Sequence, residues 1–97
     1  MKTFNEIQTI LHAHMGELRS RYKVQSLSIF GSYARNEQTD RSDADLLVEY
    51  CEAVSLFDVV DTELYLSDLL GVKVDLILKR SIHSEIRDAV LREAVPV

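Results

Sequence analysis

The sequence predicts an α/β (α+β) domain with a small mixed sheet of three to four strands packed against about four helices. Segments with helical spacing of apolar residues alternate with short runs rich in β-branched residues. The chain has 97 residues, of which 46% are apolar and 28% charged, an ordinary globular balance. A chain of this size forms one hydrophobic core, so we expect residues 1–97 to be a single domain.

A long helix and a strand are predicted for the amino-terminal part. Thr3 followed by Glu6 fits a capping box, and apolar residues continue at helical spacing to about residue 21. Residues 24–30 form a β-branched and aromatic run that ends at Gly31, which is typical of a strand.

The middle of the chain is predicted to form a turn, a second strand and a second helix. A brief helical turn is expected over residues 32–36 and a polar loop over 37–42. Residues 44–50 are nearly all apolar, which indicates a strand covered on both faces. A helix is expected over 55–70, where Ser55 and Asp58 fit a capping box and Gly71 follows as a stop signal.

The last part of the chain is predicted to form a third strand and a helix. The strand covers 72–78, and Ser81 or Ser84 opens a helix that runs to about Ala94. Its inner face is expected to carry Ile82, Ile86, Val90 and Leu91.

Polar residues at the strand ends constrain the topology. Gly31 and Ser32 follow the first strand, whereas Asp43 and Asp45 lie at the start of the second. For these residues to share one site, the two strands must run antiparallel. Asp75 lies near the start of the third strand, which should therefore run parallel to the second through the crossover helix.

The three aspartates form a candidate metal site. Asp43 and Asp45 alternate on a strand and point to the same face, and Asp75 on a neighbouring strand adds a third carboxylate. Close carboxylates should have raised pKa values unless a cation neutralises them. Mg²⁺ prefers such oxygen ligands, and two Mg²⁺ ions can clamp a phosphoryl group during displacement. Asp75 is also the best placed residue to orient or deprotonate an acceptor hydroxyl.

The turn after the first strand forms a candidate phosphate site. The amides of Gly31 and Ser32, with the Ser32 hydroxyl, can hold the β and γ phosphates of a nucleotide. Arg35 can add a bidentate contact to the phosphates, or it can pair with Glu37 or Asp40 instead.

Composition excludes several other classes of protein. The formal net charge of −5 disfavours binding to nucleic acid by general electrostatics. Cys51 is the only cysteine, which excludes an intrachain disulfide. The patterns of a calcium-binding EF-hand and of a P-loop are absent. The amino terminus lacks the apolar core of a signal peptide, and no apolar run approaches membrane-spanning length, so we expect a cytoplasmic protein.

The order Gly31-Ser32, ten residues, Asp43-x-Asp45 and a later strand with Asp75 resembles the DNA polymerase beta-like nucleotidyltransferase superfamily. Residues 4–95 are similar to its minimal nucleotidyltransferase (MNT) branch, whose members are antitoxins paired with HEPN-domain toxins. The resemblance implies that the three aspartates bind the metal and that the Gly-Ser turn binds the nucleotide phosphates.

The resemblance also implies an activity and a partner. It implies a Mg²⁺-dependent protein adenylyltransferase that transfers AMP from ATP to a tyrosine of a HEPN-domain RNase toxin and silences it. Asn36 departs from the family, which usually has glycine at this position, but asparagine tolerates the left-handed backbone that glycine would supply.

Two alternatives remain open from the sequence. The chain could neutralise its partner by binding alone, although an intact set of three aspartates favours catalysis. A small-molecule adenylyltransferase would need a second domain.

The leucine-rich helix 55–70 and the tail 94–97 belong either to the core or, where exposed, to a partner surface. Three tyrosines are expected to be packing residues rather than acceptors of AMP: Tyr33, Tyr50 and Tyr65. Self-modification of Tyr33, which lies beside the site, remains an alternative.

Overall fold

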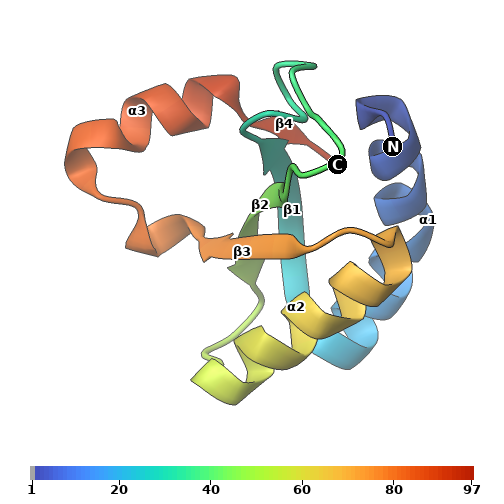
Figure 1. Cartoon of the computed structure of the whole chain (residues 1–97). Coiled ribbons are helices and arrows are strands. Elements are labelled where there is room, and N and C mark those ends of the chain that lie inside the picture. The colour runs from blue at the N-terminus through green and yellow to red at the C-terminus, as the bar shows by residue number, and fades with distance from the viewer. Residues whose placement is uncertain (1) are drawn as a thin grey trace.

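The computed structural model describes residues 2–97, which form three α-helices, one 3-10 helix and a four-stranded mixed sheet (Figure 1). The elements are α1 (Phe4–Tyr22), β1 (Val24–Phe30), β2 (Ala44–Tyr50), α2 (Leu56–Leu70), β3 (Val74–Leu78), the 3-10 helix η1 (Lys79–Ser81), α3 (Ser84–Glu93) and β4 (Val95–Pro96). None of the helices within residues 2–97 has the length and apolar character needed to cross a lipid bilayer.

The predicted helix caps are confirmed. Thr3 and Glu6 form the capping box of α1, each side chain accepting a hydrogen bond from the other residue's backbone N–H at 3.2 Å. Ser55 and Asp58 form the equivalent box of α2. Helix α2 ends at Gly71, whose φ of 69° is the left-handed conformation that glycine adopts without strain.

The sheet has the strand order β3-β2-β1-β4, and the predicted strand directions are confirmed. β1 and β2 are antiparallel, with Phe30 opposite Asp45, and β2 and β3 are parallel, with Asp45 opposite Asp75. The tail adds a fourth strand, β4, which pairs antiparallel with β1 through Val95 opposite Ile29. The end of β1 therefore lies between the starts of β2 and β4.

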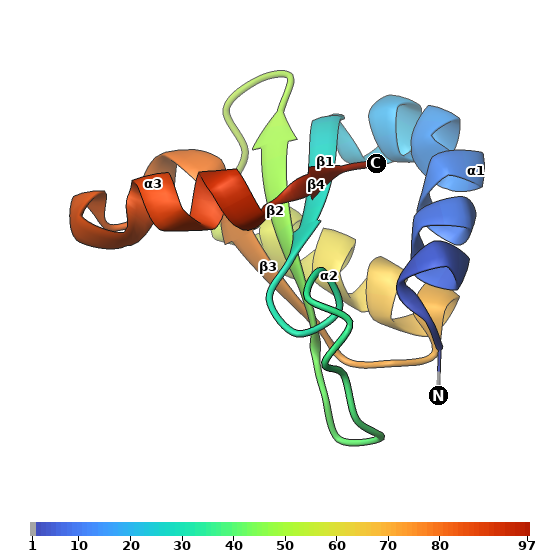
Figure 2. The same ribbon diagram turned by 90° about the horizontal axis from the view of Figure 1, so that it is seen from above.

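The hydrophobic core lies between one face of the sheet and the helices α1 and α2, which cover that face (Figure 2). Fully buried core residues come from both helices and from three strands: Ile7, Leu11, Leu18, Val24, Ile29, Leu46, Val48, Leu66, Leu70 and Val74. This packing fixes β1, β2 and β3, whose ends carry the predicted site.

Helix α3 differs from the prediction, because it has no buried residue. It projects from the other side of the sheet, away from α1 and α2 (Figures 1 and 2). Ile86, which was expected on its inner face, is 55% exposed. The other three residues of that expected face are only half-buried: Ile82, Val90 and Leu91. The amphipathic pattern is real, but little of the sheet lies beneath the helix to receive its apolar side.

Two boundaries also differ from the prediction. Residues 31–36 form hydrogen-bonded turns and no regular helix, although the Arg35 N–H donates to the Gly31 carbonyl at 3.1 Å with the spacing of one α-helical turn. β3 begins at Val74, two residues later than expected, because Gly71 and its neighbours form the turn that leaves α2.

Candidate active site

The turn after β1 lies directly against the start of β2. Gly31 is buried and has a φ of 73°, which side-chain-bearing residues rarely adopt. A Cβ atom at this position would collide with the Asp45 carboxylate. The close approach of this backbone to Asp45 therefore requires glycine.

The three predicted aspartates gather at the starts of β2 and β3. Asp45 and Asp75 are register partners on the parallel strands. Asp43 lies one residue before β2, and its carboxylate is 3.9 Å from Lys73 Nζ, which is an exposed contact. The Ala44 N–H donates to the Lys73 carbonyl at 2.8 Å, which ties the two strand starts together.

The predicted rise in carboxyl pKa is confirmed for two of these residues. Burial raises the pKa of Asp45 most, and the negative charges of Asp75 and Asp43 raise it further. Burial also raises the pKa of Asp75, followed by the charge of Asp43. These carboxylates therefore repel one another in a partly desolvated place.

The donor chemistry of this edge fits Mg²⁺. Within residues 2–97, no three His, Cys, Asp or Glu side chains are already arranged around one point as the ligands of a metal ion. Three oxygen-donor side chains that share excess negative charge match the preference of Mg²⁺.

Arg35 is held by two carboxylates at the edge of the site. Its Nε donates to Glu37 at 3.1 Å, one of the two ion pairs that the sequence left open, and Asp40 is not its partner. Its Nη1 donates to Glu93 Oε1 at 2.7 Å. The hydrogen bond with Glu37, and then the charge of Glu93, raise the pKa of Arg35.

Glu93 is the residue that the sequence analysis missed. The same Oε1 atom accepts the Gly31 N–H at 2.8 Å, so this amide, predicted as a phosphate donor, is engaged by a carboxylate. Glu93 lies 58 residues after Arg35 at the end of α3. A single glutamate in an amphipathic helix gave no local signal that its helix would return to the turn after β1.

Three further residues belong to the turn after β1: Asn36, Tyr33 and Ser32. Asn36 has a φ of 58°, so the left-handed backbone expected at this position is confirmed. Tyr33 is buried and packs in the core, and burial followed by the charge of Asp43 raises its pKa. Ser32 is half-buried beside Gly31, and its carbonyl accepts the Glu37 N–H at 2.8 Å.

The other two tyrosines are also packing residues, as predicted. The Tyr50 hydroxyl donates to Thr62 at 3.0 Å, and the Tyr65 hydroxyl donates to Glu17 at 3.0 Å. Tyr65 also stacks on Tyr22, with ring centroids 4.7 Å apart.

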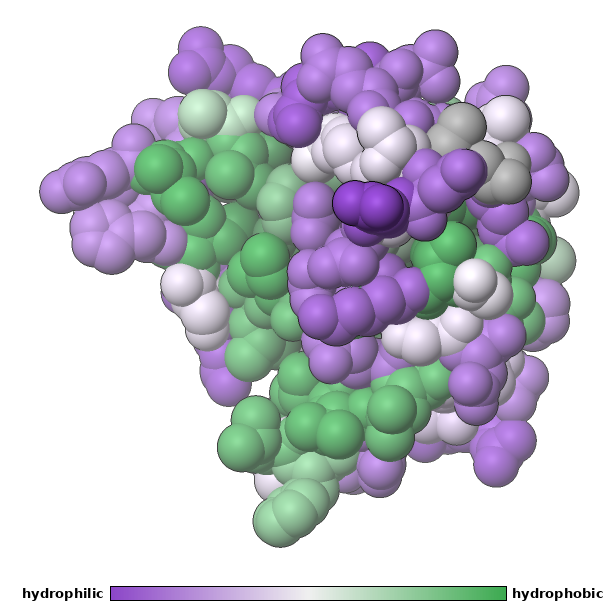
Figure 3. Space-filling model, viewed as in Figure 1, coloured by the Kyte–Doolittle hydropathy of each residue, from purple (hydrophilic) through white to green (hydrophobic). Residues whose placement is uncertain are grey.

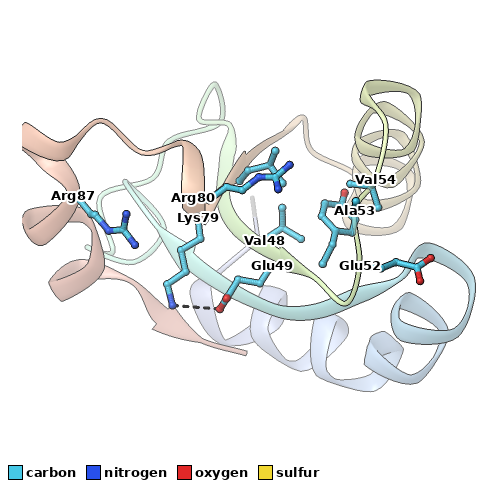
Figure 4. A pocket seen from close by; sticks show the side chains of 10 residues that line it. Val48, Glu49, Glu52, Ala53, Val54, Lys79, Arg80 and Arg87 are labelled. Carbon is cyan, nitrogen blue, oxygen red and sulfur yellow. Dashed lines mark hydrogen bonds and ion pairs between the residues drawn. The ribbon is translucent and has the colours of Figure 1, made fainter.

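A pocket of about 400 Å³, whose lining is drawn in Figure 4, lies at the carboxyl ends of β2 and β3. The aspartates lie at the opposite ends of these two strands. The wall of the pocket includes the ion pair between Lys79 and Glu49, 3.3 Å long, together with Arg80 and Arg87. None of the predicted site residues lines it. The charge repulsion and the phosphate turn therefore place the candidate active site at the aspartate edge rather than in this pocket.

Comparison with known proteins shows a consistent set of relatives. Residues 12–97 match the family described as nucleotidyltransferase domain. The MntA protein adenylyltransferase of Thermococcus cleftensis is 47% identical over 97 residues, which cover 100% of this chain and 98% of that protein. A Methanocaldococcus jannaschii protein assigned as a protein adenylyltransferase is 58% identical over 84 residues, covering 87% of this chain and 86% of that protein.

Solved structures share the fold. A minimal nucleotidyltransferase matches with a TM-score of 0.83 and 35% identity, covering 99% of this chain and 97% of that one. A chain from the structure of a tri-AMPylated Shewanella oneidensis HEPN toxin in complex with an MNT antitoxin matches with a TM-score of 0.59 and 22% identity, covering 96% of this chain and 66% of that one. At that level of identity the second match supports the fold alone.

Proposed function

The chain belongs to the nucleotidyltransferase domain family, and from this premise we propose that it is a Mg²⁺-dependent protein adenylyltransferase that acts as an antitoxin. It transfers AMP from ATP to a tyrosine of a HEPN-domain RNase toxin. One observation carries the proposal: the Gly31 turn and the paired Asp45 and Asp75 meet at one edge of the sheet. Transfer of a nucleotidyl group needs phosphate donors and carboxylates side by side.

The carboxylates have two roles in this proposal. Asp43, Asp45 and Asp75 would hold Mg²⁺, with two ions expected, and the metal would supply positive charge against the charge that develops on the transferred phosphoryl group. Asp75 also orients the tyrosine hydroxyl and accepts its proton. Asp75 is placed for this role because it lies opposite Asp45, at the edge where the phosphate turn meets the strands.

The turn positions the nucleotide. Ser32, through its amide and hydroxyl, and Arg35 hold the β and γ phosphates, so that the α phosphate faces the aspartates. Gly31 shapes the turn and allows it to lie on Asp45. The bond from the α phosphate to the β phosphate breaks, pyrophosphate leaves, and the tyrosine oxygen takes its place.

A protein is the proposed acceptor, and a HEPN-domain toxin is the proposed partner. The MntA relative, which matches this chain over 98% of its own length, is named for transfer to protein. A complex that shares the fold contains an MNT antitoxin and a tri-AMPylated HEPN toxin of S. oneidensis.

The test is label transfer to the purified HEPN-domain partner in the presence of Mg²⁺. The partner should gain label from α-labelled ATP and none from γ-labelled ATP. The double variant Asp43→Asn, Asp45→Asn should lower the rate by about a hundredfold or more, as expected when metal ligands are lost. A matched control, Asp40→Asn with Asp88→Asn, makes the same change of charge at exposed positions and should retain the rate.

Two results would contradict the proposal. The first is that the wild-type protein transfers no label to the partner. In the other, the Asp43→Asn, Asp45→Asn variant transfers none yet neutralises the toxin as fully as the wild type does. The second result would make the chain a binding module that silences its partner by occlusion.

A further inference from the structure

One oxygen atom of Glu93 joins the two ends of the phosphate turn. Oε1 accepts the Gly31 N–H at 2.8 Å and the Arg35 Nη1–H at 2.7 Å. Gly31 begins the turn, and Arg35 follows it by four residues. The carboxylate of Glu93, the last residue of α3, therefore fixes the positions of both the Gly31 backbone and the Arg35 guanidinium.

The main chain of Glu93 is fixed beside Gly31. Helix α3 ends at Glu93, and β4 begins two residues later with Val95 opposite Ile29. Ile29 is itself two residues before Gly31 on the neighbouring strand. The pairing of β4 with β1 thus holds the glutamate where its side chain meets the turn, and a mobile tail is not needed to bring it there.

The contacts leave part of Arg35 available. A guanidinium has five N–H donors, of which Nε engages Glu37 and Nη1 engages Glu93. Among residues 2–97, the Nη2 group has no hydrogen-bond partner. Arg35 is also close enough to Asp45 for its positive charge to oppose the rise in that residue's pKa. The arginine is therefore held through Nε and Nη1, and its Nη2 group is left to contact a phosphate.

We infer that Glu93 is a positioning residue, which holds the Gly31 turn and Arg35 in the geometry that receives the β and γ phosphates of ATP. The inference rests on the proposed function and deepens it. Because Glu93 satisfies the buried Gly31 amide, the phosphates bind to Ser32 and to the free edge of Arg35, and the glutamate stays in place. A rival arrangement is that Glu93 occupies the phosphate site and must leave before ATP binds.

Three variants of Glu93 separate these arrangements. Glu93→Gln keeps the length and an acceptor oxygen but loses the charge, whereas Glu93→Asp keeps the charge but shortens the reach. Glu93→Ala removes both. Asp88→Ala is the matched control, because Asp88 lies on the same helix and its exposed carboxylate forms no ion pair with any residue from 2 to 97.

The measurement is calorimetric affinity, in Mg²⁺, for α,β-methylene-ATP and for AMP, together with the unfolding temperature of each variant. Glu93→Ala and Glu93→Asp should bind α,β-methylene-ATP about tenfold more weakly, the equivalent of one hydrogen bond to a charged group. Their affinity for AMP, which lacks the β and γ phosphates, should stay unchanged. Glu93→Gln and Asp88→Ala should bind both nucleotides as the wild type does.

Several outcomes would overturn the inference. Tighter binding by Glu93→Ala and Glu93→Gln would show that the glutamate occupies the phosphate site. Equal loss of affinity for both nucleotides, with a lower unfolding temperature, would show a structural role alone. Unchanged binding by all three variants would show no role. If the wild-type protein fails to bind α,β-methylene-ATP at all, the proposed function itself fails.

Discussion

Asp45 connects the stability of the protein to the chemistry of its site. Its carboxylate lies against the Gly31 backbone, opposite Asp75 and near Asp43, in a place where burial disfavours the charged form. Such a group destabilises the fold until a cation compensates for it. Two substitutions test separately the close approach of the Gly31 backbone to Asp45 and the negative charge of the Asp45 carboxylate.

Gly31→Ala should destabilise the protein. The alanine must adopt a left-handed φ, which costs about 1 kcal/mol, and its Cβ meets the Asp45 carboxylate. Gly16→Ala is the matched control, because a Cβ at that exposed helical position meets no atom within 4 Å. The control should stabilise the protein by about 0.5 to 1 kcal/mol in urea denaturation. A Gly31→Ala variant as stable as the wild type would show that the turn is not constrained as described.

Asp45→Asn should raise the unfolding temperature of the metal-free protein at pH 7. The pKa of Asp45 is higher in the folded protein than in the unfolded chain, so its ionisation costs stability as the pH rises through that range. The cost is complete above the folded pKa and absent below the unfolded value of about 3.9. The advantage of Asp45→Asn should therefore shrink as the pH falls toward 4.

The pH series should be repeated with Mg²⁺ and with a control variant. Mg²⁺ should stabilise the wild type more than Asp45→Asn, because the ion binds the folded form of the wild type more tightly. Asp88→Asn makes the same change of charge at an exposed site and should leave the unfolding temperature nearly unchanged. An Asp45→Asn variant less stable than the wild type at pH 7 would contradict the repulsion described for this site.

At the scale of elements, local signals predicted the structure where they were present. Capping boxes and Gly71 marked α1 and α2, and the apolar run gave β2 its observed bounds, 44–50. Strand β4 has only two residues, too few to show any periodicity, and it exists because β1 offers an unpaired edge. The contacts of Glu93 depend on the pairing of β4 with β1, so no local sequence pattern could have predicted them. The meeting of Asp43, Asp45 and the Gly-Ser turn was predictable, because these residues stand at the ends of two strands that follow each other in the chain. Asp75 was predictable from the parallel direction of the third strand.

Ser55→Ala should destabilise the protein by about 1 kcal/mol through the loss of the α2 cap. Ser55 Oγ accepts the Asp58 N–H at 3.3 Å and donates to Asp58 Oδ2 at 3.2 Å. Helix α2 carries the chain from β2 to β3, so this loss should appear in global unfolding. Ser84→Ala, at the start of the exposed α3, should change stability by less than about 0.5 kcal/mol. Equal effects of the two substitutions in urea denaturation would contradict the role of the cap.

At the scale of the whole molecule, the exposed apolar face of α2 is a candidate surface for binding a partner protein. Apolar surface gathers over the amino-terminal part of α2 (Figure 3), where Leu56, Phe57, Val60 and Leu64 are 76%, 82%, 44% and 61% exposed. The sequence left this helix open between core and partner surface. Its inner face forms the core, and its outer face has the exposed apolar character of a binding surface.

The HEPN-domain partner is the proposed occupant of this face, because the proposed reaction needs a second protein to supply the tyrosine. Phe57→Ser and Leu64→Ser should each raise the Kd for that partner by about tenfold or more, as expected for large apolar side chains at an interface. Both should keep the wild-type affinity for α,β-methylene-ATP. Asp61→Ser, an exposed polar change on the same helix, is the control. Wild-type affinity of both apolar variants for the partner would place the interface elsewhere.

The most direct test of AMP transfer is the intact mass of the HEPN-domain partner after co-expression with this protein. A partner co-expressed with the wild type should carry one or more AMP units on tyrosine. A partner co-expressed with Asp45→Asn, Asp75→Asn should be unmodified. A neutralised partner that has gained no mass alongside the wild-type protein would contradict the central claim.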